Sequence, residues 1–199
     1  MPRTKQRTPE LRDRVVRVAV EMLASDGVAA FTTRRVAHEA ATSTPAVYEL
    51  FGGKAGLVRE VFFEAFRLLR RRLAQLEDSD DARADLLRVV HVFRAFAREN
   101  PVLTEVMFSR PFADFDPGPD DSAAGSSVRE LILSRVRRCI DAGVVVGDET
   151  DIAHVLLALA QGLALQERAG WLGTSETSAD RRWDMAFRAA LDGLGLPPR

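Results

Sequence analysis

The fold of this chain is decided by residues 32–54, TTRRVAHEAATSTPAVYELFGGK. Paired threonines cap a first short helix, residues 41–43 make a tight turn, and Thr44 caps a second helix that Pro45 begins. Proline is favoured there because the N–H that it lacks would have no helical partner. A glycine pair ends the second helix. This pattern predicts a helix-turn-helix, in which the second helix can enter the major groove of DNA.

The rest of the chain also has the spacing of helices, so the predicted fold class is all-α. Apolar residues recur every three or four positions, and no run of useful length alternates as a β-strand does. Residues 109–127 are rich in Pro, Gly, Asp and Ser and are expected to form a loop. The predicted helices outside the motif cover residues 9–26, 54–76, 81–99, 101–108, 128–142, 151–169 and 178–194.

Composition favours a folded, soluble protein, because 46% of the residues are hydrophobic and 28 basic side chains balance 29 acidic ones. A single cysteine, Cys139, excludes an internal disulfide and a cysteine-based metal site and fits a reducing cytosol. No signal peptide is predicted, and the most apolar stretch, residues 152–165, is too short to span a bilayer. We therefore expect a cytoplasmic protein with no membrane partner, metal or cofactor.

Charge is unevenly distributed along the chain. Residues 1–59 hold ten Lys and Arg against six Asp and Glu, whereas the remaining residues hold eighteen against twenty-three. Arg3, Lys5 and Arg7 form a basic N-terminal arm ahead of the first helix. A basic head on an acidic body predicts that only the head meets a polyanion.

The segment TTRRVAHEAATSTPAVYELFGGKAGL, with RVVRVAVEMLASDGVAAF upstream of it, resembles the N-terminal domain of the TetR/AcrR family of transcriptional regulators. The resemblance covers roughly residues 10–60, and beyond it only the helical layout is similar. It implies a three-helix DNA-binding domain with a basic arm over residues 1–53 and a helical-bundle domain for ligand binding and dimerisation over residues 54–199. The implied protein is a regulator, by family default a repressor, that binds a palindromic DNA operator as a homodimer.

Small residues at the tip of the second helix suit a close approach to base edges. The methyl groups of Thr44 and Ala46 are candidates for contact with thymine methyls. Tyr48 can reach a phosphate with its hydroxyl, and Lys54 opens the next helix, where a phosphate oxygen is favoured. The expected contacts of this helix and its flanks are Ser43, Thr44, Pro45, Ala46, Tyr48 and Lys54.

The helix before the turn contributes two further candidates. Thr33, at its start, can donate a hydrogen bond to a backbone phosphate. The family resemblance implies that the residues after it reach bases, which makes Arg34 the best candidate for a bidentate contact with guanine. The basic arm adds phosphate or minor-groove contacts.

Two positions depart from the family pattern. The turn residue that is usually glycine is Ala41, which costs free energy if the backbone needs a positive φ there. Glu49 lies within the recognition helix, where a carboxylate near phosphates is unfavourable. It either accepts a hydrogen bond from a cytosine amine or faces solvent, and the sequence leaves both possibilities open.

Eight of the eleven phenylalanines fall between Phe62 and Phe115. The family resemblance implies a ligand cavity in the regulatory half, and an aromatic lining would suit an apolar or flat effector. Phenylalanine at helical spacing is more often simply core, so both interpretations stand for each residue. The candidates for the lining are Phe66, Phe93, Phe96, Met107 and Phe108, with His91, Thr104 and Gln161 as polar contacts.

Residues 152–165 are apolar almost all round the predicted helix, which is more than one core-facing stripe requires. A second apolar face lies on the last predicted helix. Two such helices from each of two chains make a four-helix dimer interface, with burial of both helices inside one chain as the alternative. The candidate interface residues are Ala158, Gly162, Leu165, Trp183, Ala186, Phe187 and Ala190.

Three alternatives accompany this interpretation. An enzyme is not predicted, because His38, His91 and His154 are far apart in sequence, no nucleophile or metal motif is present, and residues 52–54 resemble a phosphate-binding loop only superficially. An ordinary three-helix bundle with a solvated basic face is the simplest alternative for the head. A DNA-binding regulator without a small-molecule effector, controlled by a protein partner or by abundance, stays open, as does activation instead of repression.

Overall fold

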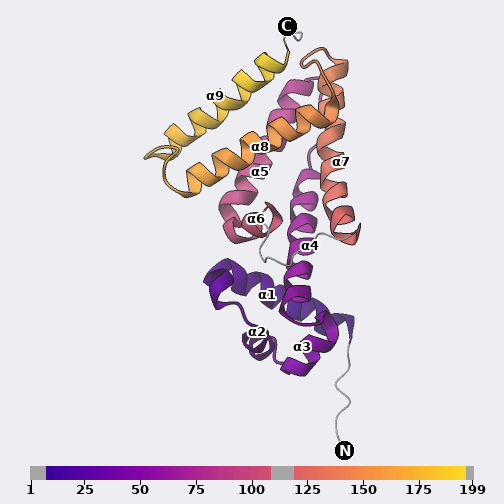
Figure 1. Ribbon diagram of the computed structural model, residues 1–199. Coiled ribbons are helices and arrows are strands. Elements are labelled where there is room, and N and C mark those ends of the chain that lie inside the picture. The colour runs from indigo at the N-terminus through magenta and orange to yellow at the C-terminus, as the bar shows by residue number, and fades with distance from the viewer. Residues whose placement is uncertain (1–7, 109–118, 196–199) are drawn as a thin grey trace, which may run out of the picture. The chain divides into compact units, whose positions relative to one another are not determined.

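The computed structural model describes residues 8–108 and 119–195, and every regular element within these ranges is an α-helix (Figure 1). The all-α fold predicted from the apolar spacing is confirmed. The predicted basic arm of Arg3, Lys5 and Arg7 lies outside the described residues. The helices are α1 (Pro9–Ala30), α2 (Thr33–Glu39), α3 (Thr44–Phe51), α4 (Lys54–Leu73), α5 (Ala82–Glu99), α6 (Pro101–Phe108), α7 (Pro119–Asp141), α8 (Glu149–Arg168) and α9 (Glu176–Leu194).

The described residues pack into two compact units. The first comprises residues 8–68, 100–108 and 119–124, and the second comprises residues 69–99 and 125–195. The packing boundary therefore falls inside α4, and α6 belongs to the first unit. This boundary describes packing only, so the predicted division between a DNA-binding part and a regulatory part at residues 53 and 54 stays a prediction.

In the first unit, α1, α2 and α3 form a head with its own apolar core, and α6 packs against α1. Val15 and Leu23 of α1 are fully buried, as the helical spacing of apolar residues predicts. Phe31, between α1 and α2, is also fully buried, as are Val36 of α2 and Val47 of α3. Each short helix is thus held by one inward-facing stripe.

The first helix is interrupted where the sequence predicts its end. Gly27 has φ 74° and ψ 178°, a non-helical conformation that glycine adopts without the steric cost of a Cβ. The predicted break is confirmed, although helical residues resume beyond it as far as Ala30.

Predicted boundaries differ from the observed ones at several helices. The cap of α3 is Ser43, not Thr44, because the Ser43 Oγ accepts a hydrogen bond from the Ala46 N–H at 3.4 Å. Helix α7 begins at Pro119, so the end of the predicted loop is helical, while residues 109–118 lie outside the described residues. Helix α4 ends at Leu73, and turns rather than helix follow it.

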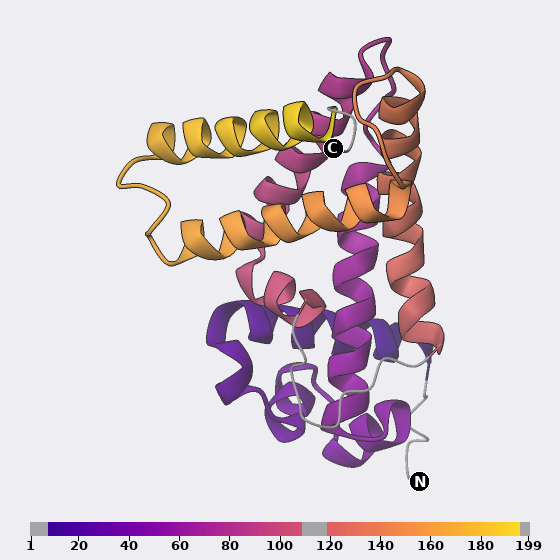
Figure 2. The ribbon, with the colours of Figure 1, turned by 45° about the horizontal axis from the view of Figure 1, so that its top comes forward.

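In the second unit, α8 packs against both α5 and α9, and Figures 1 and 2 show α8 and α9 side by side. Trp183 of α9 is almost fully buried, and its ring stacks on that of Phe187 at a centroid distance of 5.9 Å. The Val146 N–H donates to the Leu194 carbonyl at 2.8 Å, so the valine run before α8 holds the end of α9.

A buried guanidinium ties three helices of the second unit together. Arg94 of α5 donates from Nη2 and Nε to the two carboxylate oxygens of Glu167 in α8, at 2.7 and 2.9 Å. Its Nη1 donates to Asp180 of α9 at 2.7 Å, and the Trp183 indole donates to the same Glu167 at 2.8 Å. Only 9% of the Arg94 side chain and 16% of the Glu167 side chain are exposed, whereas Asp180 is 56% exposed at the edge of the network.

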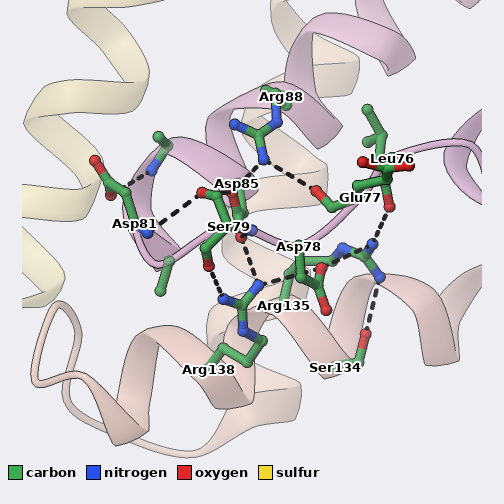
Figure 3. Close-up of polar contacts among 12 residues, drawn as sticks. Leu76, Glu77, Asp78, Ser79, Asp81, Asp85, Arg88, Ser134, Arg135 and Arg138 are labelled. Carbon is green, nitrogen blue, oxygen red and sulfur yellow. Dashed lines mark hydrogen bonds and ion pairs between the residues drawn. The ribbon is translucent and has the colours of Figure 1, made fainter.

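A second buried charge holds the connection between α4 and α5 (Figure 3). Asp85 of α5 accepts hydrogen bonds from the backbone N–H and the hydroxyl of Ser79 at 2.8 and 2.6 Å. Arg138 of α7 donates to Asp85 at 2.5 Å, and Arg88 forms an ion pair with it. Burial alone would raise the pKa of Asp85, but these hydrogen bonds and the Arg88 charge outweigh it and hold the pKa well below its ordinary value.

Candidate nucleic-acid interface

The turn between α2 and α3 sets the direction in which the second helix leaves the first. The Thr42 N–H donates to the Ala37 carbonyl at 2.8 Å, which closes the end of α2. Ala41 has φ 48° and is the only non-glycine residue with positive φ in the described ranges. An alanine in this conformation costs free energy that glycine would not. The positive φ that the sequence analysis considered for this residue is therefore present, so other contacts must hold the turn.

One such contact comes from α1. The Arg14 Nε donates a hydrogen bond to the Ala40 carbonyl at 3.0 Å, directly before Ala41. A cation is favoured at this place because the last carbonyls of a helix carry partial negative charge. Nothing in the local spacing of Arg14 marks it as a partner of a residue 26 positions away.

One face of α3 is buried and the other is open. The exposed residues are three and four positions apart, so they share one face of the helix. Any surface that meets this face meets them together. The buried side chains are Ala46, Val47 and Phe51. The exposed ones are Pro45, Tyr48 and Glu49.

One residue predicted to contact bases from the start of α3 is not accessible at the surface. Ala46 is only 7% exposed, so its methyl group packs within the head, and the expected contact with a thymine methyl is not supported. Pro45 is exposed and Thr44 is half-buried, so these two residues form the accessible tip. The Ser43 hydroxyl is engaged as the helix cap.

Tyr48 stands on the open face with 54% of its surface exposed. Its ring lies against Gly53, where an added Cβ would come within 3.1 Å of the Tyr48 Cε1. Gly53 has φ 118°, and Gly52, in the left-handed conformation with φ 71°, caps the end of α3. The glycine pair therefore both ends the helix and leaves room for the tyrosine ring.

Lys54 begins α4 and is exposed, with its Nζ 5.9 Å from the centroid of the Phe31 ring. The first turn of α4 comes very close to the end of α3. A Cβ at Gly56 would overlap the carbonyl oxygen of Phe51, so only glycine allows this approach. The start of α4 thus presents a cation and the N-terminal end of a helix beside the open face of α3, a combination that favours phosphate.

The start of α2 presents a further cation. The Thr32 Oγ1 accepts from the Arg35 N–H at 3.2 Å, so Thr32 is the cap and Thr33, half-buried, is the first helical residue. Arg35 forms an ion pair with Asp26 of α1. Arg34 is exposed and has no ion-pair partner within the described part of the chain, so its guanidinium is available to a ligand.

The predicted effector contacts divide between the two units. The Phe66 and Phe108 rings meet edge to face at 6.2 Å, and the Thr104 hydroxyl donates to the Asn100 carbonyl at 2.9 Å. His91 is exposed, with its Nε2 3.8 Å from a carboxylate oxygen of Asp184 in α9, so it lies at the surface. The first unit holds Phe66, Thr104, Met107 and Phe108, and the second holds His91, Phe93, Phe96 and Gln161.

Burial fits the core interpretation of several of these residues. Phe93, Phe96 and Met107 are buried, and the Arg72 guanidinium lies 5.5 Å from the centroid of the Phe96 ring. Gln161 is half-buried in α8. A cavity lined by the predicted set stays a prediction.

The predicted dimer residues fall into two groups. Trp183 and Phe187 are each 1% exposed, so they pack within their own chain and offer no surface to a partner. Ala186 and Ala190 are half-buried. Ala158, Gly162 and Leu165 are exposed, and Leu165 shows 66% of its surface. The open apolar surface is therefore on α8.

Other large apolar residues are also exposed. Val155, one helical turn before Ala158, is 50% exposed, and Met185 of α9 is 63% exposed. No helix in the described ranges is both long and apolar enough to cross a membrane. In the same residues, no three or more His, Cys, Asp and Glu side chains gather as a metal site would require.

Besides Arg14, two residues that the sequence pattern did not reveal are charged and buried. Arg94 stands between two buried phenylalanines, and Asp85 precedes a buried leucine. A charge inside an apolar stripe is the one signal that could have marked them, because a buried charge needs a partner.

Two parts of the chain match models of known protein families. Residues 15–61 match the model for bacterial regulatory proteins of the tetR family. Residues 86–190 match the model for the tetracyclin repressor-like C-terminal domain. The second match alone covers more than half of the chain.

Solved structures with the same fold cover nearly the whole chain. A protein of unknown function from Rhodococcus sp. RHA1 has a TM-score of 0.81 at 24% identity, over 98% of this chain and 100% of that one. The TetR family transcriptional regulator PfmR from Thermus thermophilus has a TM-score of 0.67 at 20% identity, over 88% and 98%. At these identities the likeness concerns the fold.

Among curated proteins, the chain is 33% identical over 106 residues to the nucleoid occlusion factor SlmA of Aliivibrio fischeri. The match covers 51% of this chain and 53% of that protein. The chain thus spans about half the length of the curated relatives it matches.

Proposed function

The chain belongs to the TetR family of bacterial regulatory proteins, and on this premise we propose that it is a ligand-responsive repressor that binds a palindromic operator as a homodimer. As a member of this family it is a DNA-binding transcriptional regulator and not an enzyme. The observation that carries the proposal is the open face of α3, next to the exposed cations Arg34 and Lys54.

In the proposed complex, α3 lies in the major groove with Thr44 and Pro45 leading. Arg34 makes the bidentate guanine contact, while Thr33, Tyr48 and Lys54 contact phosphates. Ser43 caps the helix and keeps its tip in position. Ala46 supports the tip from within the core.

The exposed apolar face of α8 supports the proposed dimer. Ala158 and Gly162 let a partner helix approach closely, and a Cβ at Gly162 would have nothing within 4 Å in this chain. Leu165 and Val155 supply large exposed apolar side chains on the same helix. Burial of such a patch against a second copy removes apolar area from water, which is the usual driving force of association.

A dimer can distinguish its operator from other DNA sequences better than a single short recognition helix can. Two heads about one DNA turn apart read two half-sites related by the twofold axis of the protein. An effector that binds better to a form with a different head spacing would release the operator by shifting populations. We place this regulation in the cytoplasm, where the operator is.

Selection of bound fragments from fragmented genomic DNA tests the proposal. The expected result is one enriched palindrome, bound by a particle whose light-scattering mass is that of two chains. Arg34→Ala should cost about 1–3 kcal/mol on that palindrome and relax one base preference. Equal losses on the palindrome and on random DNA would contradict the base contact, and a monomeric particle would contradict the dimer.

A further inference from the structure

Helix α2 ends in a turn whose conformation usually calls for glycine. The Thr42 N–H donates to the Ala37 carbonyl at 2.8 Å, and the Ala41 N–H donates to the His38 carbonyl at 3.0 Å. Together these two bonds form a Schellman motif, in which the residue after the helix cap is left-handed. Ala41 takes this place with φ 48°. Its Cβ opposes the conformation, because in left-handed backbone it crowds the neighbouring carbonyl oxygen.

The direction of α3 depends on this one residue. Only Thr42 and Ser43 lie between Ala41 and the first residue of α3, and the Ser43 side chain is already bound to that helix as its cap. If Ala41 relaxed to a negative φ, the Thr42 N–H would leave the Ala37 carbonyl, and α3 would turn relative to α2. The strain of the alanine therefore acts directly on the orientation of the second helix.

Arg14 of α1 counteracts this relaxation. Its Nε donates at 3.0 Å to the Ala40 carbonyl, which belongs to the peptide bond just before Ala41. The angle φ of Ala41 describes rotation against the plane of this peptide, so a partner that holds the carbonyl restrains that rotation. The Ala40 side chain is buried, with 1% of the residue exposed. The peptide is thus held by the core on one side and by the guanidinium on the other.

We propose that Arg14 is a positioning residue for DNA binding, which keeps Ala41 left-handed and thereby keeps α3 in the direction that meets DNA. The inference rests on the proposed function, because it takes α3 as the helix that lies in the groove. It goes beyond that function by making the affinity for DNA depend on a residue of α1 that acts through the turn. It also makes the need for Arg14 depend on residue 41, because a glycine there would hold the turn unaided.

A double-mutant cycle between Arg14 and Ala41 tests the inference. The probe is the genomic fragment most enriched in the selection described above, titrated by fluorescence anisotropy. Arg14→Ala should weaken binding at least about fivefold, because relaxation of the turn lowers the fraction of molecules that can bind. In the Ala41→Gly background the same change should weaken binding by no more than about twofold, since glycine is left-handed without strain.

Hydrogen exchange of the Thr42 amide, measured by NMR on the DNA-free protein, gives a second readout. This amide should exchange faster in Arg14→Ala than in the wild type, because the bond to the Ala37 carbonyl opens more often. The rate should return close to that of the wild type when Ala41→Gly is added. An exchange rate that Arg14→Ala leaves unchanged would overturn the inference.

Arg12→Ala is the matched control. Arg12 also reaches from α1 to α3, but at the far end, where its guanidinium lies 5.4 Å from the centroid of the Phe51 ring and pairs with Glu60 of α4. Ala41→Gly should not restore DNA binding to this variant. An equal rescue of both arginine variants would show general stabilisation only, and the inference would be wrong.

A direct phosphate contact is the competing role for Arg14, whose side chain is exposed. In that case Arg14→Ala would cost the same affinity in both backgrounds and would lower the slope of log affinity against log salt by about 1. Equal losses in the two backgrounds therefore overturn the inference. If the wild type enriches no fragment at all, the proposed function itself fails.

Discussion

The two units of this protein are organised by contacts of different range. In the first unit, the DNA-reading head is shaped by caps and turns that join residues three to five positions apart, such as Ser43 with Ala46 and Ala37 with Thr42. In the second unit, Arg94 meets Glu167 and Asp180, which are 73 and 86 residues away. Most contacts that set the geometry of the head are thus local, with the Arg14–Ala40 hydrogen bond as an exception, whereas the second unit depends on distant partners.

The two units also differ in the kind of residue on which their stability depends. The head depends on small residues where backbones approach, above all Gly56 beside Phe51. The second unit depends on charges that are buried and satisfied by other charges. A buried ion pair need not add net stability, but removal of one partner leaves a charge without compensation. Substitutions in the head should therefore destabilise it by steric overlap between atoms. Substitutions in the second unit should destabilise it by leaving a buried charge unpaired.

The largest effect is expected at Arg94. Arg94→Met keeps most of the volume but leaves Glu167 partly buried without its bidentate partner, so unfolding of the second unit should become easier by about 3–5 kcal/mol. Both tryptophans lie in the second unit, so urea unfolding followed by tryptophan fluorescence reports on it. Arg98→Met is the matched control, because Arg98 is half exposed in its pairs with Glu167 and Glu176. The control should cost at most about 1 kcal/mol, and equal losses would contradict the role of burial.

The next effect is expected at Asp85. Asp85→Asn removes the charge that Arg88 and Arg138 share and should cost about 1–3 kcal/mol at pH 7. Because folding lowers the pKa of Asp85, its stabilising effect is complete above the unfolded pKa of about 4 and is lost as the pH falls below it.

The stability difference between wild type and Asp85→Asn should accordingly shrink on acidification below about pH 4. Urea unfolding curves over a pH series measure it. A difference that stayed constant down to pH 2 would show that the ionised carboxylate is not what the two arginines need.

A loss of stability no larger than that at Asp85 is expected at Gly56. Gly56→Ala forces the start of α4 away from the Phe51 carbonyl and should destabilise the head by about 1–3 kcal/mol. It should also weaken DNA binding, since Lys54 moves with the helix. Gly193→Ala in α9 is the control, where a Cβ has nothing within 4 Å. Thermal unfolding followed by circular dichroism should show this control unchanged or slightly stabilised; a similar loss in both variants would contradict the close approach.

The smallest effect is expected at Lys54. Lys54→Ala should weaken binding to all DNA sequences alike and lower the slope of log affinity against log salt by about 1. Lys54→Arg keeps the charge and should restore the slope. Fluorescence anisotropy titrations at several salt concentrations measure it, and an unchanged slope in Lys54→Ala would exclude a phosphate contact.

Prediction from the sequence succeeded where the determining contacts are short in range. The break at Gly27, the turn at residues 41–43 and the glycine stop after α3 all follow from single residues whose backbone preferences are known. The cap of α3 was misplaced by one position, because Ser43 and Thr44 have the same capping chemistry and only the backbone distinguishes them.

Prediction was weaker where an apolar or charged residue could face either way. Trp183 and Phe187 have the spacing of an interface, yet they pack inside their own chain, and the exposed surface lies on α8. Ala46 has the size of a base-contacting residue, yet its methyl group points into the head. Helical spacing identifies a face of a helix but does not say what covers it.

The sequence by itself determined the class of fold, the helix-turn-helix and the family, because caps, turns and apolar periodicity act over a few residues. Only the tertiary structure decided which side of α3 is open, that Arg14 holds the turn, and that Arg94 and Asp85 are enclosed by partners. Those outcomes depend on helices that meet in space after long intervals of sequence. No local pattern encodes which distant helix a side chain will meet.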